Sequence, residues 1–184
     1  MRYLLNLALF LVVGSTSSTT QFSSLSSSEV DDIITKLRPV LRGINLPKAV
    51  RLVFHDCVGR LSILSAWVLY SDIAGGCDGC LNTDNPDNAG LDVIVDDLEE
   101  VYTENGYEAV LSRADFWALA GIQAVDKTIE LNNDNCTEVD CQVPDSGLVF
   151  QWGRVDCDTS PATDVDVELP DPKMDHANVC KPSK

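Results

Sequence analysis

The sequence has few basic side chains and almost no histidine. It carries 13 Lys and Arg against 29 Asp and Glu, which gives a formal net charge of −16, and it has only two histidines, His55 and His176. A chain this acidic is repelled by nucleic-acid phosphates and by anionic lipid surfaces. We therefore expect neither a nucleic-acid partner nor a membrane partner.

The sequence also lacks an apolar run at its start that is long enough to cross a bilayer, which takes about 20 residues. The run over residues 3–13 is shorter, follows Arg2 and precedes small residues. This layout predicts a secretory signal peptide over residues 1–18, and hence a secreted protein. The Ser/Thr-rich residues 19–28 are expected to be a lead-in to the first helix.

In a secreted chain, the cysteines are expected to form disulfides. The sequence has seven, an odd number that leaves at least one without an intramolecular partner. The sequon Asn135-Cys136-Thr137 fits the same compartment, although a cysteine in its middle position can be tied up in a disulfide and hinder glycosylation.

Apolar residues recur at helical spacing in four stretches, so a mainly α fold is expected. The predicted helices cover 29–37, 47–57, 91–101 and 112–131, with Ser112 as the cap of the last. Beyond residue 131 the pattern fails, and disulfide-held loops with a short strand around 148–152 are expected. Residues 60–75 form an atypical apolar insertion without a clear period.

The stretch RLVFHDCVG places two scarce basic residues, Arg51 and His55, four positions apart in the second predicted helix. At this spacing the two side chains share one helix face. A neutral imidazole can act as a general base there, while the guanidinium stabilises a developing anion. Taken alone, however, such a pair is more typical of a surface or capping pair.

Six blocks of sequence follow one another along the chain: Arg51–Cys57, Gly76–Asp78, Asp87–Leu91, Ser112–Asp115 with Ala118–Gly121, Gly153–Asp156 and Leu169–Asp171. In this order they resemble the distal half of the plant, fungal and bacterial haem peroxidase family. The resemblance extends from about Glu29 to Asp171 and is specific because of the shared order. Phe54, the cysteines and the predicted signal peptide resemble the secreted branches.

The resemblance implies a haem b enzyme that reduces hydrogen peroxide with electrons from a small donor, in response to oxidative stress. It implies that His55 moves a proton between the peroxide oxygens and that Arg51 stabilises the departing hydroxide. It further implies that Asn88 orients His55 through the second ring nitrogen.

The resemblance also implies a calcium site formed by Asp56, Gly76 and Asp78. Cys80 stands where secreted relatives often have a serine oxygen, so the set of ligands is incomplete. A hydrogen-bonded carboxylate at a helix end is the alternative for Asp56.

The Cys77–Cys80 pair fits neither a thioredoxin-type site, which needs a βαβ unit, nor a zinc site, which needs a second pair at matching spacing. A structural disulfide from Cys57 to Cys77 or Cys80 is expected instead. A second disulfide could join Cys136 and Cys141.

The resemblance ends before the helix that carries the iron's axial histidine in the family. We therefore expect residues 29–171 to be a partial peroxidase domain and 172–184 a tail, in which His176 is a poor axial ligand because the segment has no helical period. An incomplete domain exposes an apolar haem-facing surface that a partner could cover. Two alternatives remain: a catalytically inactive, secreted peroxidase-like binding protein, and an unrelated disulfide-stapled module.

Overall fold

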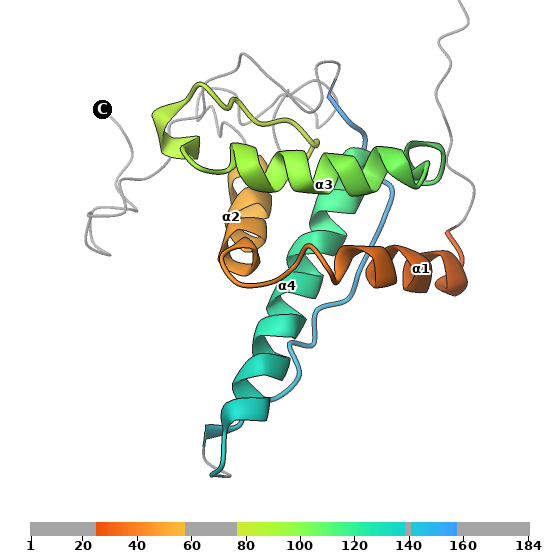
Figure 1. Ribbon diagram of the computed structural model, residues 1–184. Coiled ribbons are helices and arrows are strands. Elements are labelled where there is room, and N and C mark those ends of the chain that lie inside the picture. Colours follow the sequence, from red (N-terminus) through yellow and green to blue (C-terminus); the bar gives the residue numbers. More distant parts are fainter. Residues whose placement is uncertain (1–24, 58–76, 139–140, 158–184) are drawn as a thin grey trace, which may run out of the picture.

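The computed structural model describes residues 25–57, 77–138 and 141–157, and within these the fold is helical. The long helix α4 runs diagonally through the molecule, α2 packs along it, and α1 and α3 cross it (Figure 1). The mainly α prediction is therefore confirmed. The elements are α1 (Ser27–Leu37), α2 (Asn45–Cys57), the short 3-10 helix η1 (Pro86–Asn88), α3 (Asp92–Glu104), the 3-10 helix η2 (Tyr107–Ala109) and α4 (Arg113–Asn135).

The four predicted α-helices are all present, and side-chain caps set the starts of α1 and α4. Ser26 caps α1 in a capping box, since its backbone N–H donates to Glu29 Oε2 at 2.8 Å and its hydroxyl accepts the Glu29 N–H. Helix α2 begins at Asn45, ahead of the expected Pro47, because a proline in the first turn lacks only an N–H that needs no helical partner. Ser112 caps α4 as predicted.

The prediction of a short strand around 148–152 is wrong. This segment belongs to no sheet, and it runs back along α4 (Figure 1). Its polar contacts go to α4 side chains: Ser146 donates to Asp126 Oδ1, and the Gly153 N–H donates to Asp115 Oδ2 at 2.7 Å. The β-rich composition favoured a strand, but the structure has no strand among the described residues beside which this segment could pair.

Three disulfides hold the described residues together. They join Cys57 to Cys77, Cys80 to Cys157, and Cys136 to Cys141. The first and third pairings were among those predicted, whereas the link from Cys80 to Cys157 was not. The predicted signal peptide, the insertion at 60–75, and the tail with His176 lie outside the described residues.

No helix in the described ranges is both long enough and apolar enough to cross a membrane.

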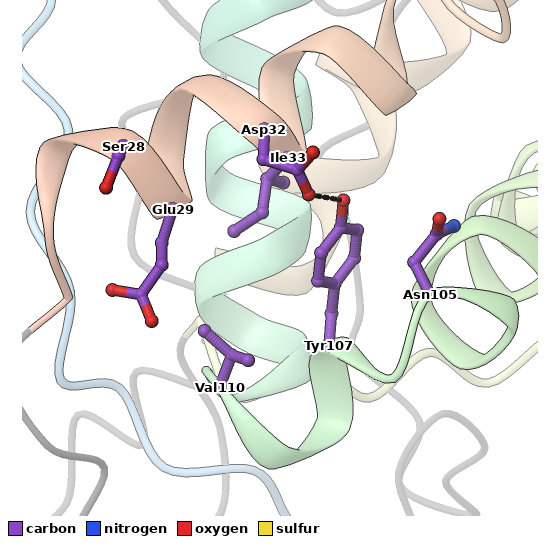
Figure 2. Close-up of a pocket in the computed structure, with 7 residues that line it drawn as sticks. All are labelled: Ser28, Glu29, Asp32, Ile33, Asn105, Tyr107 and Val110. Carbon is purple, nitrogen blue, oxygen red and sulfur yellow. Dashed lines mark hydrogen bonds between the residues drawn. The ribbon is translucent and has the colours of Figure 1, made fainter.

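The shallow cavity beside α1 has a volume of about 260 Å³ and sits between the first turn of α1 and η2 (Figure 2). The Tyr107 hydroxyl crosses it and donates to Asp32 Oδ2 at 2.7 Å. Glu29, the other carboxylate at its rim, belongs to the α1 capping box. Both acidic groups thus have partners within the protein, so we interpret this contact as one that fixes α1 against η2.

The contact between α2 and α4 positions the second helix, and Gly121 makes it possible. A Cβ at Gly121 would lie 2.6 Å from Val53 Cγ2, far inside van der Waals contact. The two helices therefore approach closely at this point, and the buried apolar residues of both extend the contact into a single core.

Enlarging Gly121 is expected to separate the two helices. We predict that Gly121→Val destabilises the fold by about 2 kcal/mol, because a β-branched side chain opposite Val53 overpacks the interface. Urea unfolding followed by circular dichroism measures the loss. Combining it with Val53→Ala should recover part of it, and a double variant no more stable than Gly121→Val would show that the contact is not the cause.

Candidate functional site

Arg51 and His55 lie on one face of α2, one turn apart, as their spacing predicted. Arg51 Nε donates to His55 Nε2 at 3.3 Å, and both side chains are half-buried. A ring nitrogen that accepts a hydrogen bond carries no proton. The single lone pair of Nε2 therefore accepts from a guanidinium that carries a permanent positive charge.

The other side of the imidazole is held by Asn88 in η1. His55 Nδ1 lies 2.6 Å from Asn88 Oδ1. The Asn88 amide has a fixed orientation because its Nδ2 donates to the Asn82 carbonyl at 2.7 Å, which leaves Oδ1 facing the ring. A carboxamide oxygen can only accept, so the ring proton resides on Nδ1. The structure thus brings Asn88 and His55 together and sets the tautomer that leaves Nε2 basic.

Backbone carbonyls hold the guanidinium. Arg51 Nη1 donates to the Ala89 carbonyl at 3.0 Å, and Arg51 Nη2 donates to the Asp87 carbonyl. Together with Nε bound to His55, these contacts fix the plane of the guanidinium against the loop around η1. The carbonyls of Asn82, Asp87 and Ala89 could not be predicted as partners, because every residue carries the same backbone acceptor.

An uncovered apolar surface adjoins the basic pair. Phe54 is 53 % exposed, and its ring meets the His55 ring edge-on at a centroid distance of 5.7 Å. Val50, one turn earlier on α2, is also exposed. An exposed aromatic ring next to a half-buried base suits contact with a flat apolar group, because such a group would bury Phe54 while reaching His55.

Asp56 points the opposite way from this surface, into the loop after the first disulfide. It is buried, and its Oδ1 accepts the Cys80 N–H at 3.2 Å. The same N–H lies 3.3 Å from Asp78 Oδ1, so the two carboxylates are close neighbours. Burial, and next the negative charge of Asp78, raise the pKa of Asp56 to about 8, against the lowering effect of the backbone N–H donors.

Two carboxylates in this position are oxygen donors of the kind that calcium prefers. Asp78 also lies near the sulfurs of Cys80 and Cys157, but these sulfurs form a disulfide and offer no thiolate. Gly76, the third predicted ligand, lies outside the described residues. Asp56 is thus a hydrogen-bonded carboxylate at the end of α2, and its role as a calcium ligand stays a prediction.

Comparison with known proteins gives one family. The family model described as peroxidase matches residues 27–181, which is most of the chain. No curated protein matches the sequence.

Proposed function

The chain belongs to the peroxidase family, and from this premise we propose that it is a secreted haem peroxidase that reduces hydrogen peroxide with electrons from a small donor. The observation that carries the proposal is the hydrogen-bonded series from Asn88 through His55 to Arg51. It leaves one basic nitrogen, Nε2, beside one fixed positive charge. Peroxide cleavage needs both, since a proton must move and a hydroxide must depart.

His55 acts as the proton carrier in this proposal. Once its hydrogen bond from Arg51 Nε opens, Nε2 takes a proton from one oxygen of the peroxide and returns it to the other, so that the second oxygen leaves as water. Asn88 keeps the ring from rotating, because its oxygen holds the Nδ1 proton throughout. Arg51 stabilises the negative charge that accumulates on the departing oxygen.

The surface around Phe54 and Val50 would hold the haem, whose iron supplies the electrons for breaking the O–O bond. The fit rests on the exposed ring of Phe54 beside His55, which a flat apolar macrocycle would cover. The three disulfides fit an oxidising compartment and support the proposed secretion.

Donor oxidation tests the proposal. The full chain, loaded with haem, is mixed with hydrogen peroxide and a phenolic donor, and the oxidised donor is measured by absorbance. We expect donor oxidation in proportion to the peroxide consumed. Haem-loaded chain that consumes no peroxide would contradict the proposal and favour the inactive binding protein.

Asn88 should contribute through the orientation of His55. We predict that Asn88→Ala lowers the rate of peroxide consumption by about 10- to 100-fold, in the range seen when a residue that orients a site histidine is lost. Asn88→Asp should retain more activity, because a carboxylate still accepts the Nδ1 proton. Stopped-flow rates at equal haem loading measure this, and equal rates in Asn88→Ala and the unmodified chain would exclude the positioning role.

We also propose that calcium binds between Asp56 and Asp78. The donor chemistry fits, since two neighbouring carboxylates repel each other unless a proton or a cation lies between them. Gly76 would add a carbonyl oxygen, in keeping with the family resemblance.

The raised pKa of Asp56 makes stability depend on pH. Between the ordinary pKa near 4 and the folded value of about 8, the folded state binds more protons than the unfolded state. Without calcium, we therefore predict that stability falls as pH rises from 5 to 8, by at most about 1.4 kcal/mol per pH unit. Calcium should reverse the fall, because it binds the deprotonated pair.

Urea unfolding at a series of pH values, with calcium or with chelator, checks this prediction. Asp78→Asn should flatten the profile and weaken the calcium effect. Asp134→Asn is the matched control, because it removes the same charge from an exposed position at the far end of α4. Profiles that are the same for both variants, or insensitive to calcium, would refute the calcium site.

A further inference from the structure

The far tip of α4 projects away from α1, α2 and α3 (Figure 1). Asn135 is the last residue of the helix and is exposed, and Thr137, two positions on, is exposed as well. Cys136, between them, has an extended backbone with φ −88° and ψ 114°. This is the one place in the sequence where an asparagine is followed at the second position by serine or threonine.

The Asn135 side chain can carry a substituent without losing its contact. Its Nδ2 donates to the Leu131 carbonyl at 2.7 Å, which uses one of two amide hydrogens. The second hydrogen can be replaced while the first continues to donate. A bulky group here would extend into solvent, away from Arg51 and His55 in α2.

We propose that Asn135 is an N-glycosylation site. The amide nitrogen would attack the anomeric carbon of a lipid-linked oligosaccharide diphosphate. The new bond joins Nδ2 to the anomeric carbon, the bond from that carbon to the diphosphate oxygen breaks, and the amide proton is released with the lipid diphosphate. This inference rests on the proposed secretion and is independent of the proposed peroxidase activity.

The disulfide next to the site should control how fully it is modified. Cys136, the middle residue of the sequon, is joined to Cys141, only five positions away. Asn132 and Asn133 also hold the loop, by donating to the carbonyls of Cys141 and Val143. The disulfide fixes the backbone of the sequon, which the glycan-transferring enzyme must bind in its active site. Glycan transfer and disulfide formation therefore compete in the newly made chain.

Cell-free translation of the full chain with microsomal membranes tests the proposal. We expect a part of the chain to gain the mass of one glycan, which an N-glycosidase removes. Thr137→Ala should abolish the shift, because it destroys the sequon. Cys141→Ser leaves Asn135-Cys136-Thr137 intact but prevents loop closure, so its glycosylated fraction should rise.

Protease protection of the same samples tests the proposed secretion separately from the glycosylation of Asn135. Chain that is protected inside the membranes yet carries no glycan overturns the glycosylation site and leaves secretion standing. Chain that is neither protected nor glycosylated overturns both. A glycan seen only in Cys141→Ser shows that the disulfide blocks the natural chain, and this outcome also overturns the proposal.

Discussion

Replacing His55 with alanine should lower the rate of peroxide consumption by the haem-loaded chain by about 10²- to 10⁴-fold, the usual contribution of a general acid–base residue. The reason lies in the hydrogen bonds of the ring. Nδ1 is held by Asn88 and Nε2 faces Arg51, so Nε2 is the ring nitrogen that is placed to take the proton. Stopped-flow measurement at equal haem loading gives the rate.

Chemical rescue separates lost chemistry from lost structure. His55 is half-buried and is not one of the buried apolar residues of the core, so the variant should retain the helical circular dichroism of the unmodified chain. Added imidazole should restore part of the rate by entering the space left by the ring. A rate unchanged by the substitution would show that another group carries the proton.

Replacing Asp115 with alanine should destabilise the fold by about 2–3 kcal/mol, the cost of losing hydrogen bonds to a buried carboxylate whose ion-pair partner Arg154 is partly exposed. Asp115 is 1 % exposed. Its carboxylate accepts the backbone N–H of Gly153 at 2.7 Å and a guanidinium N–H of Arg154 at 2.8 Å. Without it, the segment after residue 141 loses its central attachment to α4.

The urea midpoint of unfolding measures this loss. Asp134→Ala is the control on the same helix, because Asp134 is exposed, and it should change stability by no more than about 0.5 kcal/mol. Asp115→Asn should fall between the two, since the amide oxygen can still accept the Gly153 N–H. Equal losses in the Asp115 and Asp134 variants would show that the attachment contributes nothing.

The helices could be predicted because their signals are local. Apolar spacing located all four, and Ser112 was found as the cap of α4 because the capping serine and the third residue after it lie within one turn. The partner of Asp115 could not be foreseen. Its spacing to Ser112 suggests a capping pair, but the carboxylate turns to Gly153 and Arg154, which are distant in sequence.

The side chains of the candidate site could be predicted from the sequence, but several of their contacts could not. The sequence places Arg51 and His55 on one helix face, and the family resemblance adds Asn88 and Asp78 from later blocks. The disulfide between Cys80 and Cys157 escaped prediction because spacing alone does not determine connectivity. The carbonyls that accept hydrogen bonds from Arg51 and Asn88 could not be predicted, because a backbone carbonyl is the same whatever the residue type.

A haem titration of the full chain tests the central claim most directly, because every role given to Arg51, His55 and Asn88 depends on a haem beside them. The account predicts a Soret band that grows with added haem and saturates at one haem per chain. Phe54→Asp, which places a charge on the uncovered apolar surface, should weaken this binding. Titration that yields no saturable Soret band would contradict the account.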